Sequence, residues 1–179
     1  MNIVLIGYRG AGKSTIGRNL GVRLGKIFVD TDELIEKREG SSIQEIVTIK
    51  GWKYFRILEK ETVQAVSRED QLIIAPGGGA ILDDENVASL KEKGLIIWLK
   101  AAGPILWERI IKEFSGAARR PSLTGKGTQE EFEEVLTFRN SLYEKAADAI
   151  IDTAPLSAEG VVESVLKIIR QGRENSFGR

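Results

Sequence analysis

The sequence predicts an α/β fold in which helices flank a parallel β-sheet. Apolar runs of strand length alternate with longer segments of helical periodicity, and turn residues follow each run. That alternation is typical of βαβ units, whose strands pair in parallel. The length of 179 residues, with 42% hydrophobic and 29% charged residues, suits one domain with a sizeable core.

Five strands are predicted, and their nearly continuous apolar composition indicates that both faces of each are buried. They cover residues 2–6, 27–30, 72–75, 95–99 and 149–152. Helices are expected near residues 14–24, 32–39, 43–50, 52–67, 84–93, 104–114, 129–145 and 158–171. Ser42 and Glu45 have the spacing of a capping box at the start of one helix.

Two segments depart from this alternation. Residues 115–128 show neither periodicity but contain three glycines, a proline, two adjacent arginines and a lysine, which is typical of a functional lid. Residues 172–179 are expected to form a flexible tail behind a single domain that spans residues 1–171.

The composition excludes several kinds of chemistry. The chain has no histidine and no cysteine, so catalysis through these residues, disulfides and the usual zinc sites are ruled out. A net charge of zero predicts no nucleic-acid partner. The apolar runs are too short to span a membrane and no signal peptide is evident, so we expect a cytoplasmic protein without a membrane partner.

A phosphate-binding loop follows the first predicted strand. Residues 7–15 match GxxxxGK[ST] between an apolar strand and an amphipathic helix, the context that this pattern requires. Backbone N–H groups of such a loop bind phosphate oxygens, Lys13 can reach the outer phosphates, and Ser14 can offer its hydroxyl to Mg²⁺. The sequence therefore predicts a nucleoside triphosphate site.

An acceptor site is predicted where the second strand ends. Asp30 and Asp32 stand there, and ligands of open parallel sheets bind at the carboxyl ends of strands. One carboxylate can face a metal ion while the other accepts a proton from an acceptor hydroxyl. The alternative is a helix N-cap, because Asp or Thr before an amphipathic run is a normal start signal.

Glycines and arginines extend the candidate site. Residues 77–79 are three consecutive glycines after the third strand, which indicates close approach of a ligand to the backbone, with a plain flexible turn as the alternative. Arg119 and Arg120 can close over phosphates as forked donors. Arg56 and Arg139 are isolated, and isolated arginines are usually solvated.

Taken in order, these motifs resemble the shikimate kinases from residue 2 to about residue 169. They are GxxxxGKST at 7–15, DTD at 30–32, FR at 55–56, GGG at 77–79, RP at 120–121 and RNSLYE at 139–144. The resemblance implies a P-loop three-layer sandwich with a five-stranded parallel sheet, a substrate-binding segment at about 32–61 and a closing lid at about 115–128. It also implies transfer of the γ-phosphate of ATP to the 3-hydroxyl of shikimate, in aromatic amino acid biosynthesis, with Mg²⁺ as the cofactor.

The resemblance implies roles for individual residues. ATP phosphates would be bound by Gly10, Ala11, Gly12, Lys13, Ser14, Thr15 and Arg120, and Mg²⁺ by Ser14 directly and by Asp30 through water. Shikimate would be bound by Asp32, Arg56, Gly78 and Arg139. Catalysis would fall to Lys13, Asp32 and Arg120, with Asp32 orienting or deprotonating the attacking oxygen.

Two positions depart from the family pattern. The family usually has Gly-Glu before its FR element, whereas Trp52 and Lys53 follow Gly51 in this chain. The arginines that flank adenine in the family have no clear match, with Arg109 and Pro155 nearest to their positions. We expect a monomer whose partners are ATP and shikimate. The alternatives are another small-metabolite kinase of this fold, such as a gluconate or nucleoside monophosphate kinase, or a nucleotide-gated binding module.

Overall fold

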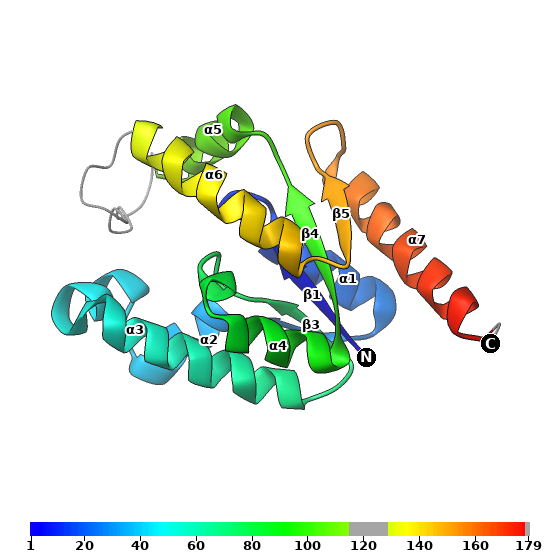
Figure 1. The fold of residues 1–179 in the computed structure, drawn as a ribbon, viewed down its shortest axis with the longest axis horizontal. Coiled ribbons are helices and arrows are strands. Elements are labelled where there is room, and N and C mark those ends of the chain that lie inside the picture. The colour runs from blue at the N-terminus through cyan, green and yellow to red at the C-terminus, as the bar shows by residue number, and fades with distance from the viewer. Residues whose placement is uncertain (115–128, 178–179) are drawn as a thin grey trace.

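The fold is a five-stranded parallel sheet with the strand order β2-β3-β1-β4-β5, as the computed structural model of residues 1–114 and 129–177 shows (Figure 1). The strands are β1 (Asn2–Ile6), β2 (Ile27–Asp30), β3 (Leu72–Ala75), β4 (Gly94–Lys100) and β5 (Ala149–Asp152). The predicted fold class is confirmed, and four of the five predicted strands have the observed bounds.

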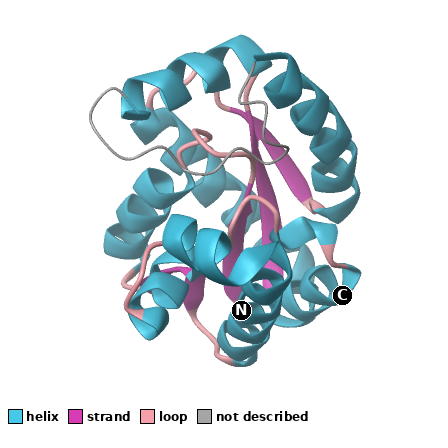
Figure 2. Ribbon diagram, turned by 90° about the vertical axis from the view of Figure 1, so that its left-hand side faces the viewer, coloured by secondary structure: helices cyan, strands magenta, loops and turns pink. Residues whose placement is uncertain are grey.

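Helices connect the strands at the predicted places (Figure 2). They are α1 (Lys13–Leu24), α2 (Thr31–Glu39), α3 (Ile43–Arg68), the short 3₁₀ helix η1 (Ala80–Leu82), α4 (Asp84–Lys93), α5 (Gly103–Phe114), α6 (Gln129–Ala146) and α7 (Ala158–Phe177). The capping box predicted from Ser42 and Glu45 is present at the start of α3.

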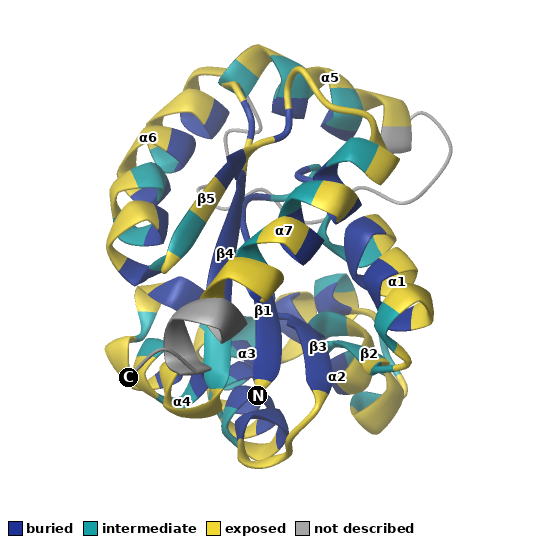
Figure 3. Ribbon diagram, turned by 90° about the vertical axis from the view of Figure 1, so that its right-hand side faces the viewer, coloured by how far each residue is buried: buried dark blue, intermediate teal, exposed yellow. Residues whose placement is uncertain are grey.

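The helices form a layer on each face of the sheet. Helix α1 packs against β1, β2 and β3 and also contacts α7, whereas α4 and α6 pack against β4. Figure 3 shows the buried strands β1 and β4 between the α6 side and the α1 side of the molecule. This arrangement gives the three layers that the sequence predicted.

The strands differ in burial, which corrects one expectation. Strands β1 and β3 are buried along their whole length, because each lies between two neighbours and two helix layers. The edge strands β2 and β5 are not: Ile27 is 70% exposed and Ile150 is 46% exposed. An apolar run therefore identified the strand but not its position at the edge of the sheet.

A second, smaller core holds α2 and α3 together. It consists of Ile35, Ile43, Ile46, Val47, Phe55 and Leu58. The two helices predicted at 43–50 and 52–67 form the two halves of α3, which meet at a kink at Gly51, where φ is 81° and ψ is 165°. These angles belong to a region that essentially only glycine occupies. Gly51 therefore sets the direction of the second half of α3.

The last helix extends further than predicted. Helix α7 ends at Phe177 instead of Gln171, because Gly172 lowers helix stability by only about 1 kcal/mol and no proline follows it. No helix within residues 1–114 or 129–177 combines the length and the apolar character that crossing a membrane demands.

Replacement of Gly51 by alanine is expected to destabilise the protein. The backbone at residue 51 has a conformation that only glycine adopts readily, and an alanine Cβ would be strained in it. The free energy of unfolding, measured by urea titration, should fall by about 1–3 kcal/mol. Gly172→Ala in α7 is the matched control, since a Cβ there meets nothing within 4 Å, and it should be neutral or stabilising by up to about 1 kcal/mol. An equally stable Gly51→Ala protein would contradict the assignment of the break to this residue.

Candidate active site

The candidate site lies where three neighbouring strands end at the same edge of the sheet. Strands β2, β3 and β1 are adjacent, and Asp30 at the end of β2 is in register with Ala75 at the end of β3. The segments that follow these strands are the loop at 7–12, the start of α2 and the glycines at 77–79. The topology thus brings together the motifs that the sequence singled out.

The glycine-rich loop leads directly into α1. Gly10 and Gly12 have positive φ values of 80° and 89°, and Gly12 is the N-cap residue of the helix. The Lys13 ammonium lies across the loop, donating hydrogen bonds to the carbonyl oxygens of Gly7 at 2.8 Å and Tyr8 at 3.4 Å. The loop therefore presents a helix N-terminus and a cation together, which is the chemistry of a phosphate site.

The loop is held in place from the α5–α6 side. Arg109 on α5 donates a hydrogen bond to the Gly10 carbonyl at 3.2 Å. The Tyr8 ring meets Phe132 of α6 edge to face at 5.3 Å between centroids, and Phe132 in turn contacts Trp107 of α5 at 5.1 Å. The two helices that border residues 115–128 along the chain are thus packed against the phosphate loop.

Asp30 links the loop to α2 by using both of its carboxylate oxygens. Its Oδ2 accepts a hydrogen bond from the Ser14 hydroxyl at 2.8 Å. Its Oδ1 accepts from the backbone N–H groups of Asp32 at 3.0 Å and Glu33 at 3.4 Å, and so caps α2. The sequence offered a helix N-cap as the alternative to a metal-facing carboxylate. In the structure Asp30 is an N-cap and also contacts Ser14, the proposed metal ligand.

The Ser14 and Asp30 pair suits a magnesium ion. A hydroxyl and a carboxylate are hard oxygen donors, and Mg²⁺ in kinases is bound by few protein groups together with substrate phosphates and water. The described residues contain no group of three or more Asp, Glu, His or Cys that could hold a metal ion.

Thr31 and Asp32, at the start of α2, both lie against Gly77. The buried Thr31 hydroxyl accepts a hydrogen bond from the Gly77 N–H at 3.1 Å, whereas Asp32 is partly exposed. A Cβ on Gly77 would lie 2.5 Å from Asp32 Oδ1, so the carboxylate rests directly against this glycine. Thr31 and Asp32 therefore both contact Gly77, one through a hydrogen bond to its N–H and the other through the space that a side chain would fill.

Arg56 enters the site from the second half of α3. Its guanidinium forms an ion pair of 2.5 Å with Glu59, whose side chain is only 2% exposed, while the Arg56 side chain is 32% exposed. A Cβ on Gly79 would stand 2.6 Å from Arg56 Nη2. The glycine therefore leaves the space that the guanidinium fills.

Arg139 and Tyr143 of α6 converge on the Gly78 carbonyl. Tyr143 donates a hydrogen bond to this oxygen at 2.5 Å and Arg139 donates one at 3.4 Å. Arg139 is buried, and its guanidinium lies 5.5 Å from the centre of the Tyr8 ring. Arg139 is thus a fixed part of the site and not the solvated surface residue that its position in the sequence alone suggested.

Burial changes the acid–base properties of Glu59 and Tyr143. It raises the pKa of Glu59, an effect that Arg56 and Arg139 oppose and that the neighbouring Asp32 carboxylate reinforces. Burial also raises the pKa of Tyr143, which keeps the phenol protonated as a hydrogen-bond donor to Gly78.

Sequence reasoning missed Glu59 and Tyr143. Glu59 lies among the apolar residues that form the buried face of α3, such as Phe55, Leu58 and Val63. A carboxylate on such a face indicates that an oppositely charged partner lies beside it. Tyr143 lies one helical turn after Arg139 in the RNSLYE motif, so both side chains occupy the same face of α6.

Of the predicted site residues, those at the strand ends and on α3 and α6 lie together. Arg120, and with it the predicted lid at 115–128, lies outside the described residues, so its role stays a prediction. Ala11 is buried in the loop, whereas Thr15 is exposed on α1.

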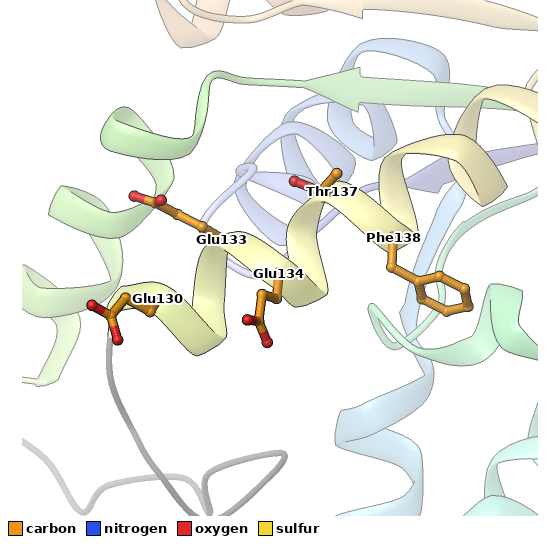
Figure 4. A pocket seen from close by; sticks show the side chains of 5 residues that line it. All are labelled: Glu130, Glu133, Glu134, Thr137 and Phe138. Carbon is orange, nitrogen blue, oxygen red and sulfur yellow. The ribbon is translucent and has the colours of Figure 1, made fainter.

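A separate open hollow of about 610 Å³ lies beside α6 (Figure 4). Its lining includes Glu130, Glu133, Glu134, Thr137 and Phe138. Three carboxylates disfavour the binding of phosphates or a carboxylate ligand, so the strand-end cluster remains the better candidate for an anionic substrate.

Comparison with known proteins identifies the family. The family model described as shikimate kinase matches residues 9–170. A shikimate kinase of Syntrophus aciditrophicus is 39% identical, covering 97% of this chain and 93% of the relative. Shikimate kinase 2 of Yersinia enterocolitica is 40% identical, covering 93% of this chain and 94% of the relative.

Solved structures agree with this result. Shikimate kinase from Acinetobacter baumannii in complex with shikimate superimposes with a TM-score of 0.87 at 30% identity, over 96% of this chain and 93% of that one. Shikimate kinase from Aquifex aeolicus gives a TM-score of 0.80 at 30% identity, with both chains fully covered. A gluconokinase from Sinorhizobium meliloti, at 14% identity and a TM-score of 0.56, shares the fold alone. The chain belongs to the shikimate kinase family.

Proposed function

We propose that the chain transfers the γ-phosphate of ATP to the 3-hydroxyl of shikimate at the strand-end site, giving shikimate 3-phosphate and ADP. The observation that carries this proposal is the geometry around residues 77–79. Arg56 and Arg139 there provide two cations for a carboxylate, and Asp32 lies beside Gly77 as a hydrogen-bond acceptor for a hydroxyl. A small anionic polyol needs both at once.

The phosphate loop supplies the other half of the reaction. Residues Gly10 to Thr15 would bind the ATP phosphates, with Lys13 turning from the loop carbonyls toward the outer phosphates. Ser14 would bind Mg²⁺ and Asp30 would hold it through water; when bound, the ion neutralises charge on the phosphoryl oxygens. Arg120 would add a second cation there.

The proposed reaction requires no covalent bond between the protein and the transferred phosphoryl group. Phosphoryl transfer passes through a loose transition state, so positioning and charge neutralisation contribute most of the rate. Asp32 would accept a hydrogen bond from the 3-hydroxyl and take its proton as the bond to phosphorus forms. Arg56 and Arg139 would fix the distant carboxylate of shikimate, and so orient that hydroxyl. We further propose that the protein works as a monomer.

A coupled ADP-release assay tests this function. ADP release should depend on shikimate and not on gluconate or nucleoside monophosphates. Lys13→Ala should lower the shikimate-dependent kcat by about 10²–10³-fold, because a cation aimed at the phosphates is lost. Lys26→Ala is the matched control, since that lysine bonds Met1 and Gln71 at the surface. ATP hydrolysis indifferent to every acceptor would instead favour a nucleotide-gated binding module, and unchanged turnover in Lys13→Ala would remove the loop from the mechanism.

Arg139→Ala should raise the KM for shikimate by about 10–100-fold, the loss expected for one charge-assisted hydrogen bond, and leave the KM for ATP within about twofold. Steady-state kinetics with each substrate varied in turn measures both constants. Arg139→Lys keeps the charge but not the forked geometry, and should fall in between. Equal changes in the two KM values would argue against binding of the shikimate carboxylate by Arg139.

The acid side of the pH profile should reflect two carboxylates with different effects. Only the ionised Glu59 carboxylate forms the ion pair that holds Arg56 in place, and burial raises the pKa of Glu59. The KM for shikimate should therefore rise at low pH, where Glu59 becomes protonated. Because this pKa is raised on folding, protonated Glu59 stabilises the fold at low pH, and that contribution is lost as pH rises through the folded-state pKa. Glu59→Gln should raise the KM already at neutral pH and remove the part of its pH dependence that comes from Glu59, whereas Asp32→Asn should lower kcat by about 10²-fold or more. A full kcat with an unaltered profile in Asp32→Asn would show that Asp32 is not the proton acceptor.

A further inference from the structure

The Arg56 guanidinium is enclosed on the protein side by three neighbours. Glu59 pairs with it at 2.5 Å, and the rings of Trp52 and Phe55 lie 5.4 Å and 5.3 Å from its central carbon. The two rings meet edge to face, 5.9 Å apart at an angle of 81°. The Arg56 side chain nevertheless remains 32% exposed, so the guanidinium is held by these three neighbours and is still accessible to a ligand.

Trp52 owes its place beside Arg56 to the break in α3. Gly51 immediately precedes it, with a conformation that redirects the chain, and Trp52 begins the helical segment that carries Phe55, Arg56 and Glu59. Residues 52 and 56 are one turn apart, so their side chains share a helix face. The indole also packs against the small core of α2 and α3, which fixes its orientation.

We propose that Trp52 is a positioning residue for shikimate binding, which holds the Arg56 guanidinium by a cation–π contact in the orientation that receives the substrate carboxylate. The proposal rests on the proposed function of Arg56 and deepens it. A guanidinium within about 6 Å of an indole is attracted to the ring face, and Trp is the strongest such partner. Phe55 supplies a weaker face, and Glu59 supplies the ionic bond.

Charge explains why an aromatic ring suits this position. Glu59 and Asp32 already place two carboxylates near Arg56, and their mutual repulsion contributes to the raised pKa of Glu59. A third carboxylate would orient the guanidinium at the cost of repelling the carboxylate of the substrate. An indole orients the guanidinium without adding negative charge to the site.

Tyr54 on the same helix provides a matched control. It too packs against the small core, and its ring lies under a cation, with Lys50 Nζ 4.5 Å from the ring centre. Its hydroxyl donates to Glu39 at 3.1 Å, so its contacts belong to the α2–α3 surface and do not include Arg56. A substitution there disturbs core packing to a similar degree but leaves the guanidinium alone.

The test is a set of substitutions read by steady-state kinetics and by calorimetric titration with shikimate. Trp52→Leu should raise the KM and the Kd for shikimate by about 3–30-fold, with the KM for ATP unchanged, and Trp52→Phe should recover most of the loss. Tyr54→Leu should leave the shikimate constants within about twofold. In an Arg56→Ala background, Trp52→Leu should add less than about twofold, because the group through which it acts is gone. Trp52→Met replaces the leucine variant if thermal unfolding shows that variant to be unfolded.

The outcomes separate this inference from the proposed function. If Arg56→Ala raises the KM for shikimate but Trp52→Leu does not, or if the Trp52→Leu effect persists without Arg56, the positioning role is wrong and the proposed function stands. An equal rise in Tyr54→Leu would likewise overturn it, as an effect of packing alone. If Arg56→Ala leaves the KM unchanged, the proposed binding of carboxylate by Arg56 fails, and the role of Trp52 fails with it.

Discussion

Side chains from separate elements meet beyond the end of β3 only because residues 77–79 have no side chains of their own. A Cβ at Gly77 would collide with the Asp32 carboxylate, and one at Gly79 would collide with the Arg56 guanidinium. Between them, the Gly78 carbonyl receives hydrogen bonds from α6. Helices α2, α3 and α6 thus reach one short segment of backbone, and the proposed acceptor site exists because that segment occupies so little volume.

The same edge of the sheet joins the phosphate loop to this acceptor site. Asp30 caps α2 with one oxygen and accepts from Ser14 with the other, so the beginning of α1 and the beginning of α2 are fixed to the same carboxylate. A change at Asp30 would therefore disturb both the proposed metal site and the position of Asp32 two residues later. One carboxylate, Asp30, thus both caps α2 and fixes the position of Ser14 in the candidate site.

Much of the fold was predictable from the sequence, because a parallel sheet leaves a strong signal. Buried strands are apolar without interruption, and β1, β2, β3 and β5 were placed with their observed bounds. What local pattern could not provide was information about neighbours. Ile27 is apolar yet exposed, since β2 lies at an edge, and α7 continues past Gly172 because a single glycine does not end a helix.

Part of the candidate site was also predictable from local sequence pattern, but the contacts between residues of different elements were not. Motifs at strand ends meet because topology requires it, so Lys13, Asp32 and Gly78 could be grouped from the sequence. Glu59 could not, because its importance depends on the ion pair with Arg56, one helical turn away, and on the burial of the Glu59 carboxylate against other elements. Residues whose role is to hold another residue leave no motif of their own in one sequence.

The absence of histidine and cysteine is consistent with the chemistry that this geometry supports. A carboxylate such as Asp32 is a weak base toward an alcohol, and would be a poor catalyst if the proton had to leave before phosphorus was attacked. In a loose transition state the hydroxyl becomes acidic only as its bond to phosphorus forms, so a nearby oxygen acceptor is sufficient. The demanding part is placing the hydroxyl in line, and in the proposed function that would fall to the guanidinium groups at the far end of the substrate. Fixed positions of Arg56 and Arg139 would then matter as much to the rate as the identity of the base. Both guanidinium groups are in fact held by aromatic rings as well as by a hydrogen bond or an ion pair, as that proposal requires.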